Sequence, residues 1–180
     1  EVSRRWKASR TEGALVRALD ALRAGDIEGV EAELGVVGGH AFALDPERGH
    51  WRVVGDERTI DLAPPRGTPS EDLALRDFTV NALGLTPDGP LDPLHGEGDL
   101  AARRLVAAGP SALRDDPLRG LRGVRLAASL GLRWHDATRA EAAAVAAELA
   151  AGTRAAPAAE RMRDELVALL YVPRPGDALA

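Results

Sequence analysis

The 180-residue chain is long enough for one domain or two small subdomains, and its 45% of hydrophobic residues can form a core. A net charge of −5 does not by itself indicate a nucleic-acid partner, and 3% of aromatic residues leaves few platforms for stacking bases. The lack of cysteine excludes disulfides and thiolate metal sites and fits a cytoplasmic protein. The sequence has no signal peptide and no run of about 18 apolar residues that could span a membrane. Because it begins without Met, we expect a fragment or a processed product.

The first third of the chain predicts a helix followed by a small sheet. Apolar residues recur at helical spacing over 12–34, with a break expected at Gly25. The runs HAFALD (40–45) and HWRVV (50–54) flank the turn sequence DPERG and predict a hairpin. A third short strand is expected in ERTIDL, before two prolines stop it. We expect this sheet to be antiparallel at least in part.

The rest of the chain predicts helices joined by loops. Ser70 is the expected N-cap of a helix with acids in its first turn. Residues 77–85 are apolar with helical spacing, and the Gly-, Pro- and Asp-rich stretch 86–100 predicts a loop. Helices are also expected at 115–132, 137–151 and 156–170. The fold class is therefore α+β.

Charged residues on the predicted helix DDPLRGLRGVRLAASLGL are the first candidates for a functional site. Arg119, Arg122 and Arg125 recur every third residue and form a slanting stripe, with Asp116 three residues before it. A carboxylate only accepts hydrogen bonds and a guanidinium only donates them, so together they offer both kinds of group to a nucleobase. The remaining guanidiniums suit phosphates. The simpler interpretation, a solvated face of intrahelical ion pairs, stays open.

The stretch LALRDFTVNALGL (73–85) places polar side chains at the start of an apolar run and inside it. Asp77 and Asn81 are neighbours on a helix, four residues apart. One interpretation is a polar wall around a ligand, with Arg76 as a phosphate contact. The other is a helix cap with a buried Asn that binds a neighbouring loop.

The stretch LDPLHGEGDL carries Asp92 and Asp99, a spacing that can suggest a cation. It lacks the regular oxygen ligands of a calcium loop. We therefore favour an aspartate-rich turn that orients the flanking helices. The four histidines have no metal-ligand spacing either.

Four stretches together resemble a known family: LRDFTVNAL, LDPLHGEGDL, DDPLRGLRGVRLAASLG and AERMRDEL. In order and spacing they are similar to motifs of the class II tRNA nucleotidyltransferases and the bacterial poly(A) polymerases. The resemblance runs from about Val36 to Leu170. It implies a partial nucleotidyltransferase head at 1–85, with an incomplete sheet and flanking helices. An all-helical neck at 86–180 is then expected to read the nucleotide base.

The resemblance also implies an activity. It predicts template-independent addition of CMP and AMP to the 3′ end of tRNA, or of AMP to another RNA. The RNA 3′-hydroxyl would attack the α-phosphate of ATP or CTP with the help of Mg²⁺.

Roles for individual residues follow from the matched motifs. Asp116 and Arg119 would pair with the base edge of the nucleotide. Arg122 and Arg125 would support the triphosphate or the reader helix, Arg76 would contact phosphate, and Asn81 would contact the sugar or a loop. Supporting positions in these motifs are Asp77, Asp92, Asp99, Arg161 and Arg163.

The sequence departs from the family at the metal site. The family's Asp-x-Asp motif, which holds Mg²⁺, is not intact, and the nearest pattern is Asp26-x-Glu28. Asp61 lies where family members often carry a further acid, so Asp26, Glu28 and Asp61 are the candidate catalytic and metal residues. Two other hypotheses stay open: a non-catalytic nucleotide- or RNA-binding module of this family, and a helical interaction domain whose charges are only solvated.

Overall fold

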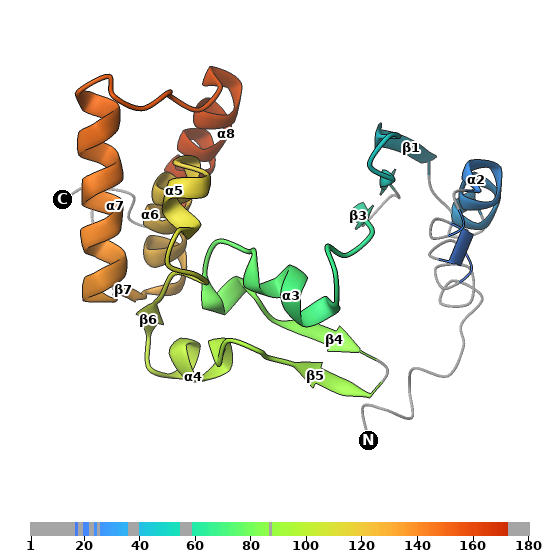
Figure 1. Cartoon of the computed structure of the whole chain (residues 1–180), viewed down its shortest axis with the longest axis horizontal. Helices are drawn as coiled ribbons and strands as arrows, with labels where there is room; N and C mark the ends of the chain where they lie inside the picture. The colour runs from blue at the N-terminus through green and yellow to red at the C-terminus, as the bar shows by residue number, and fades with distance from the viewer. Residues whose placement is uncertain are drawn as a thin grey trace. The chain divides into compact units, whose positions relative to one another are not determined.

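The computed structural model describes residues 17, 20, 21, 24, 26–35, 40–54, 59–86 and 88–172. The chain forms two compact units, Glu1–Arg66 and Gly67–Ala180, and each is described by itself. Both combine helices with short strands, so the α+β class is confirmed (Figure 1). No helix in these described ranges is long and apolar enough to cross a bilayer. The expected head–neck boundary after residue 85 concerns functional parts and stays a prediction.

The first unit contains a three-stranded antiparallel sheet in the order β1-β2-β3. The predicted hairpin and third strand are confirmed, and the sheet is antiparallel throughout. Trp51 and Val53 alternate with Arg52 along the central strand, so the first two are buried with Leu62 and with Val30 of the preceding helix. The elements are α2 (Ile27–Gly35), β1 (His40–Asp45), β2 (His50–Val54) and β3 (Thr59–Leu62).

Asp26 interrupts the helix that the sequence predicted over 12–34. Residues 17, 20, 21 and 24 are helical, Asp26 is not, and α2 begins at the next residue. The Asp26 carboxylate accepts a hydrogen bond from the backbone N–H of Gly29 at 2.9 Å, a typical capping contact. Gly25, where we expected the break, lies outside the described residues.

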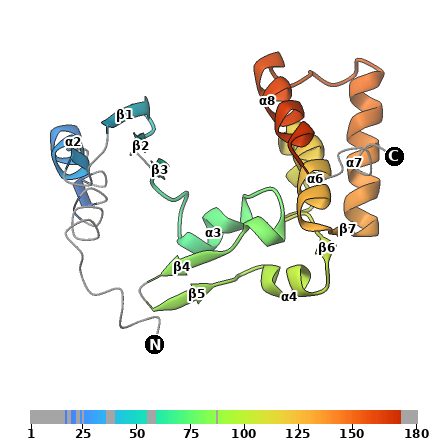
Figure 2. The same cartoon turned by 180° about the vertical axis from the view of Figure 1, so that it is seen from behind.

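The second unit is mainly helical. Its helices are α3 (Pro69–Ala74), η2 (Thr79–Asn81), α4 (Gly96–Ala101), α5 (Ala112–Asp115), α6 (Leu118–Leu130), α7 (Asp136–Ala150) and α8 (Ala159–Leu170). Its strands are β4 (Gly84–Thr86), β5 (Gly89–Leu91), β6 (Arg104–Leu105) and β7 (Arg133–Trp134). The three long helices confirm the predictions for 115–132, 137–151 and 156–170 to within a few residues. In both views α6 lies between α7 and α8 (Figures 1 and 2).

Two local predictions in this unit are wrong. The N-cap of α3 is Thr68 and not Ser70, because Pro69 takes the first helical position and Glu71 completes a capping box with Thr68. Residues 77–85 do not form a helix. They form one 3₁₀ turn, η2, and then enter β4, because Phe78 is extended and bridges Ala107.

The region from 86 to 100 is also more ordered than the predicted loop. It contains the β4–β5 hairpin and the short helix α4. Nor is the predicted neck entirely helical, since β6 and β7 form a short parallel pair. Strands this short carry too few residues for a sequence pattern to reveal them.

A hydrophobic core joins α6 to the segments on either side of it. Phe78, Leu105, Leu113 and Val145 are buried in one cluster with three further apolar residues. The rings of Phe78 and Trp134 meet edge to face, with centroids 6.0 Å apart. Gly123 of α6 permits this contact, because an added Cβ would lie 2.7 Å from Cζ of Phe78 and even closer to the Trp134 ring. The position of α6 therefore depends on a glycine in its centre.

Candidate functional site

Asp116 lies at the start of α6, just before Pro117. Its backbone is extended, and its Oδ1 accepts the N–H of Leu118 at 3.1 Å. Its Oδ2 accepts a hydrogen bond from Nη2 of Arg161 on α8 at 2.6 Å. Partial burial opposes ionisation, but Arg161, the Leu118 N–H and the charge of Arg119 outweigh it and lower the pKa of Asp116. The Asp116 carboxylate is thus a charged hydrogen-bond acceptor next to the N-terminus of α6.

Arg119 is held by backbone oxygens. Its Nη1 donates to the carbonyls of Arg76 at 3.0 Å and Ala112 at 3.1 Å, and its Nη2 donates to the carbonyl of Leu75 at 2.9 Å. These bonds join the first turn of α6 to the segment that follows α3. The sequence placed Arg119 beside the acceptor but could not predict its carbonyl partners, two of which lie more than 40 residues away in the sequence.

Arg122 and Arg125 share one carboxylate on α8. Nε of Arg122 lies 3.0 Å from Oε1 of Glu165, and Nε of Arg125 lies 2.7 Å from Oε2. Burial alone would raise the pKa of Glu165, but the bonds from Arg125 and Arg122 outweigh it and lower the pKa. The predicted arginine stripe lies on α6, and two of its members, Arg122 and Arg125, face α8 instead of open solvent.

The segment between α3 and η2 is fixed by Asp77, which is buried. Its Oδ1 accepts from the N–H of Phe78 at 2.8 Å and from Nδ2 of Asn81 at 3.2 Å. Its Oδ2 pairs with Nη1 of Arg122 at 3.2 Å. The polar residues of this stretch therefore form a local cap and a tie to α6, while Arg76 is half-exposed and pairs with Asp72 at 3.1 Å.

Asp92 and Asp99 are structural in the described geometry. Asp92 accepts the N–H groups of Gly96 at 2.7 Å and Glu97 at 3.1 Å and so caps α4. Burial opposes ionisation of Asp92, but these backbone bonds outweigh it and lower its pKa. Asp99 is buried and accepts from the Thr79 hydroxyl and from Arg104, both at 2.8 Å. This agrees with the preferred interpretation of a turn that orients its neighbours.

The three candidate metal residues do not converge on one another. Asp26 caps α2, and Glu28 lies exposed on that helix. Asp61 forms a two-pronged ion pair with Arg52, at 2.6 and 2.8 Å, and the bond from Arg52 lowers its pKa. Among the described residues no group of three or more acidic or histidine side chains could hold a metal ion. Asp26, Glu28 and Asp61 therefore do not fit a metal centre in this arrangement.

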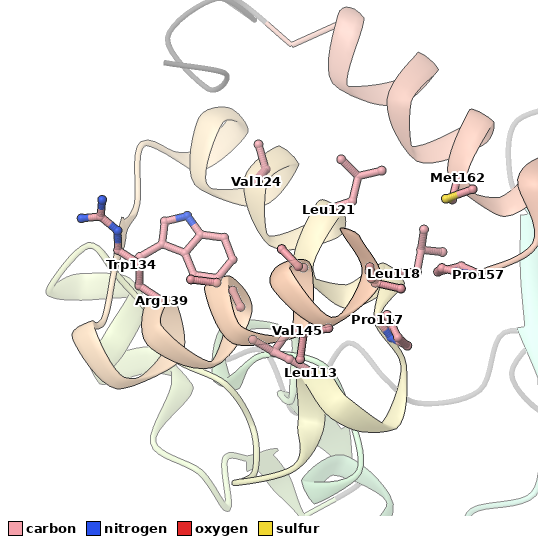
Figure 3. Close-up of a pocket in the computed structure, with 15 residues that line it drawn as sticks. Leu113, Pro117, Leu118, Leu121, Val124, Trp134, Arg139, Val145, Pro157 and Met162 are labelled. Atoms are coloured by element: carbon pink, nitrogen blue, oxygen red, sulfur yellow. The ribbon is translucent and has the colours of Figure 1, made fainter. Parts of the chain in front are cut away.

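A mainly apolar groove of about 490 Å³ lies along α6 and is lined by residues of α6 and α7, with Leu113 of α5 and Met162 of α8. Leu121 and Val124 line its α6 wall, while Trp134 lies at one end and Met162 at the other (Figure 3). Arg139 is the charged residue of its lining. The groove thus offers few polar groups that could orient a nucleotide, in contrast to the arginine stripe of α6.

Sequence reasoning missed two partners of this site. Glu165 was inside a recognised motif but received no role, although it lies four residues after Arg161 and shares its face of α8. That spacing was a usable signal. Arg104, the partner of Asp99, was not detectable because nothing in the local sequence indicates the contact. Arg163, in contrast, is well exposed, and its Nη2 lies 3.1 Å from Oδ1 of the adjacent Asp164.

Comparison with known proteins gives relatives over most of the chain. No protein-family model matches the sequence. It is 44% identical over 146 residues to the A-adding tRNA nucleotidyltransferase of Deinococcus radiodurans, covering 81% of this chain and 34% of that protein. It is 48% identical over 139 residues to the CC-adding tRNA nucleotidyltransferase of Thermus thermophilus, covering 77% of this chain and 32% of that protein. The chain thus spans about a third of the length of these curated relatives.

Solved structures share the fold. A tRNA nucleotidyltransferase complexed with a primer tRNA and an incoming ATP analog superposes with a TM-score of 0.73 at 23% identity, over 85% of this chain and 47% of that chain. The Bacillus stearothermophilus CCA-adding enzyme in complex with CTP gives a TM-score of 0.68 at 27% identity, over 84% of this chain and 39% of that chain. At this identity the first likeness concerns the fold alone.

Proposed function

The chain belongs to the tRNA nucleotidyltransferase family, and we propose that it carries the nucleotide-reading part of an enzyme that extends the 3′ end of tRNA without a template. The observation that carries this proposal is the charged Asp116 acceptor at the start of α6, with the Arg119 and Arg161 guanidiniums beside it. The A-adding and CC-adding relatives support the same activity. The partners we propose are ATP or CTP and the tRNA 3′ end, in the cytoplasm.

The chemistry of the bases explains why an aspartate beside arginines suits this task. Adenine and cytosine both present an amino donor next to a ring-nitrogen acceptor on the Watson–Crick edge. Guanine and uracil present the reverse order. A carboxylate acceptor beside a guanidinium donor complements the first pair and leaves like groups facing each other in the second. Such mismatched polar groups are strongly rejected in a binding site.

The proposed reaction joins the nucleotide to RNA. The RNA 3′-hydroxyl attacks the α-phosphate of ATP or CTP, a new phosphodiester bond forms, and pyrophosphate leaves. Mg²⁺ is the metal expected for this chemistry, but Asp26, Glu28 and Asp61 do not form a group that could hold it. We therefore assign the described residues to binding and orienting the nucleotide. Arg76, exposed beside the Arg119 anchor, is the proposed phosphate contact.

A second candidate is a nucleotide-binding module without catalysis. The observation that favours it is the contrast between the charged Asp116 and arginine groups at α6 and the candidate metal residues, of which Asp26 and Asp61 are engaged in other contacts. Both candidates predict the same selectivity for the base. They differ in whether this chain can transfer a nucleotide.

Calorimetric titration with ATP, CTP, GTP and UTP in the presence of Mg²⁺ tests what the two candidates share. We expect ATP or CTP, or both, to bind more tightly than GTP and UTP. If none of the four nucleotides binds, the proposal is contradicted, and the hypothesis of a helical interaction domain is favoured instead. Primer extension on tRNA that lacks its 3′ end then separates the candidates, since only the first extends the RNA.

A further inference from the structure

Helix α8 supplies one of the two groups that hold the proposed base acceptor. Arg161 and Asp116 are separated by 45 positions in the sequence, yet Nη2 of Arg161 lies 2.6 Å from Oδ2 of Asp116. The other oxygen, Oδ1, is bound to the N–H of Leu118. Each oxygen of the carboxylate thus has its own donor, and these donors come from different helices.

This arrangement restricts the orientation of the carboxylate. The terminal torsion of an aspartate has a broad preference, so one contact would leave the group free to turn. Two donors at opposite oxygens fix its plane. The side chains stay accessible to a ligand, because Asp116 is 27% exposed and Arg161 is 53% exposed. A nucleotide can therefore reach an acceptor whose direction is already set.

We propose that Arg161 is a positioning residue that sets base specificity, by holding the Asp116 carboxylate in one orientation as an acceptor. This inference rests on the proposed role of Asp116 in reading the base. Arg119 cannot replace Arg161 in this task, because its guanidinium is anchored on the carbonyls of Leu75, Arg76 and Ala112. Specificity then depends on the packing of α8 against α6.

The charged groups around Asp116 determine its pKa and therefore the pH dependence of nucleotide binding. Arg161 approaches from α8, Arg119 from α6, and Asp115 precedes it at the end of α5, where it accepts from the Ser111 hydroxyl at 2.9 Å. Arg161 lowers the pKa of Asp116, so its removal raises that pKa. Binding that needs the charged acceptor is present above the pKa and is lost as the pH falls through it. The acid limit of binding should therefore move to higher pH without Arg161.

Arg161→Ala in the full chain tests the proposal, with Arg163→Ala as the matched control on the same helix. Arg163 is 70% exposed and pairs with its neighbour Asp164, so its loss removes equal charge without touching Asp116. We expect the preference for ATP and CTP over GTP and UTP to fall about tenfold in Arg161→Ala, the effect of one charge-assisted hydrogen bond. The acid limit of ATP binding should also move to higher pH in Arg161→Ala, because the pKa of Asp116 rises when Arg161 is removed. Protonation of the free base is the same for all variants and cancels in the comparison.

Several outcomes decide the matter. Unchanged selectivity and an unchanged acid limit in a folded Arg161→Ala variant would overturn the inference while leaving the proposed function intact. Equal losses in Arg161→Ala and Arg163→Ala would overturn it too, since general charge would then be the cause. If the unsubstituted chain binds no nucleotide, the proposed function fails first and the specificity role fails with it. Thermal melts of each variant exclude unfolding as the cause. Arg161→Lys keeps the positive charge but lacks the planar guanidinium, so it should retain part of the selectivity.

Discussion

Glu165 of α8 is the carboxylate on which the polar contact between α6 and α8 depends. It accepts Nε of Arg122 at 3.0 Å and Nε of Arg125 at 2.7 Å, and its side chain is only 12% exposed. Glu165→Gln keeps the size of the side chain and removes its charge. The glutamine oxygen can accept from only one of the two arginines, and the amide NH2 then faces the other guanidinium, donor against donor. Arg122 keeps its contact with Asp77 at 3.2 Å.

The size of the effect follows from the exposure of the groups. Hydrogen bonds to charged partners contribute about 1.5–3 kcal/mol each. Solvent screening reduces this value, because the arginines are 36% and 27% exposed. We expect Glu165→Gln to lower the free energy of unfolding by about 2 kcal/mol. In a unit of this size, that loss lowers the melting temperature by roughly 6–10 °C.

Thermal unfolding followed by circular dichroism at several pH values measures this loss. The pKa of Glu165 is lowered in the folded protein, so its contribution is complete above the ordinary glutamate pKa of about 4.3. It then disappears as the pH falls through the lower folded pKa. The melting curves of the two proteins should therefore converge in acid.

Asp164→Asn is the matched control for this prediction, because the neighbouring Asp164 is 70% exposed and pairs with Arg163. It should melt close to the unsubstituted protein. Equal melting temperatures for Glu165→Gln and the unsubstituted protein at neutral pH would refute the reasoning. So would a difference that does not change with pH, because the lost interaction would then not be ionic.

Three further predictions follow from single contacts. Gly123→Ala should lower the free energy of unfolding in urea by about 1–3 kcal/mol, because the added Cβ would lie 2.7 Å from Cζ of Phe78. Gly120→Ala is the control: its Cβ would have no neighbour within 4 Å, so it should be neutral or stabilising. Asp99→Ala should lower the free energy of unfolding by about 1–3 kcal/mol in the same measurement, because it leaves the buried Thr79 hydroxyl without its acceptor and removes the ion pair of half-exposed Arg104. The exposed Glu97→Ala should change it little, and similar values for both variants would contradict the buried role of Asp99. Exchange of all three candidate metal carboxylates for amides should leave the Mg²⁺ titration isotherm unchanged, and loss of a binding event would show that they do hold metal.

Much of the fold could be predicted because its long elements carry strong local signals. The strands around DPERG and the three long helices have clear periodicity and turn chemistry, and the structure contains them. The stretch 77–85 misled the prediction, because apolar residues at helical spacing also fit a buried 3₁₀ turn that enters a strand. Phe78 is buried by tertiary contacts with Trp134, and these override its local preference.

The candidate site could be predicted as a set of residues but not as a network. Asp116 and the arginines of α6 were identifiable from residue type and spacing. The spacing of Arg161 and Glu165 places both on one face of α8, but their pairing with α6 could not be predicted, because these contacts join positions at least 40 residues apart. The carbonyls that anchor Arg119 carry no sequence signal at all, since every residue has one.

The central claim is that Asp116 reads the base, and its most direct test is a comparison of Asp116→Asn with Asp115→Asn. Both variants lose one charge at adjacent positions, but only Asp116 accepts from Arg161. Calorimetric titration with all four nucleotides should show that Asp115→Asn keeps the preference for ATP or CTP. In Asp116→Asn that preference should be lost, with little change in melting temperature. Retention of full selectivity in Asp116→Asn would contradict the account, because the base would then be read by another group.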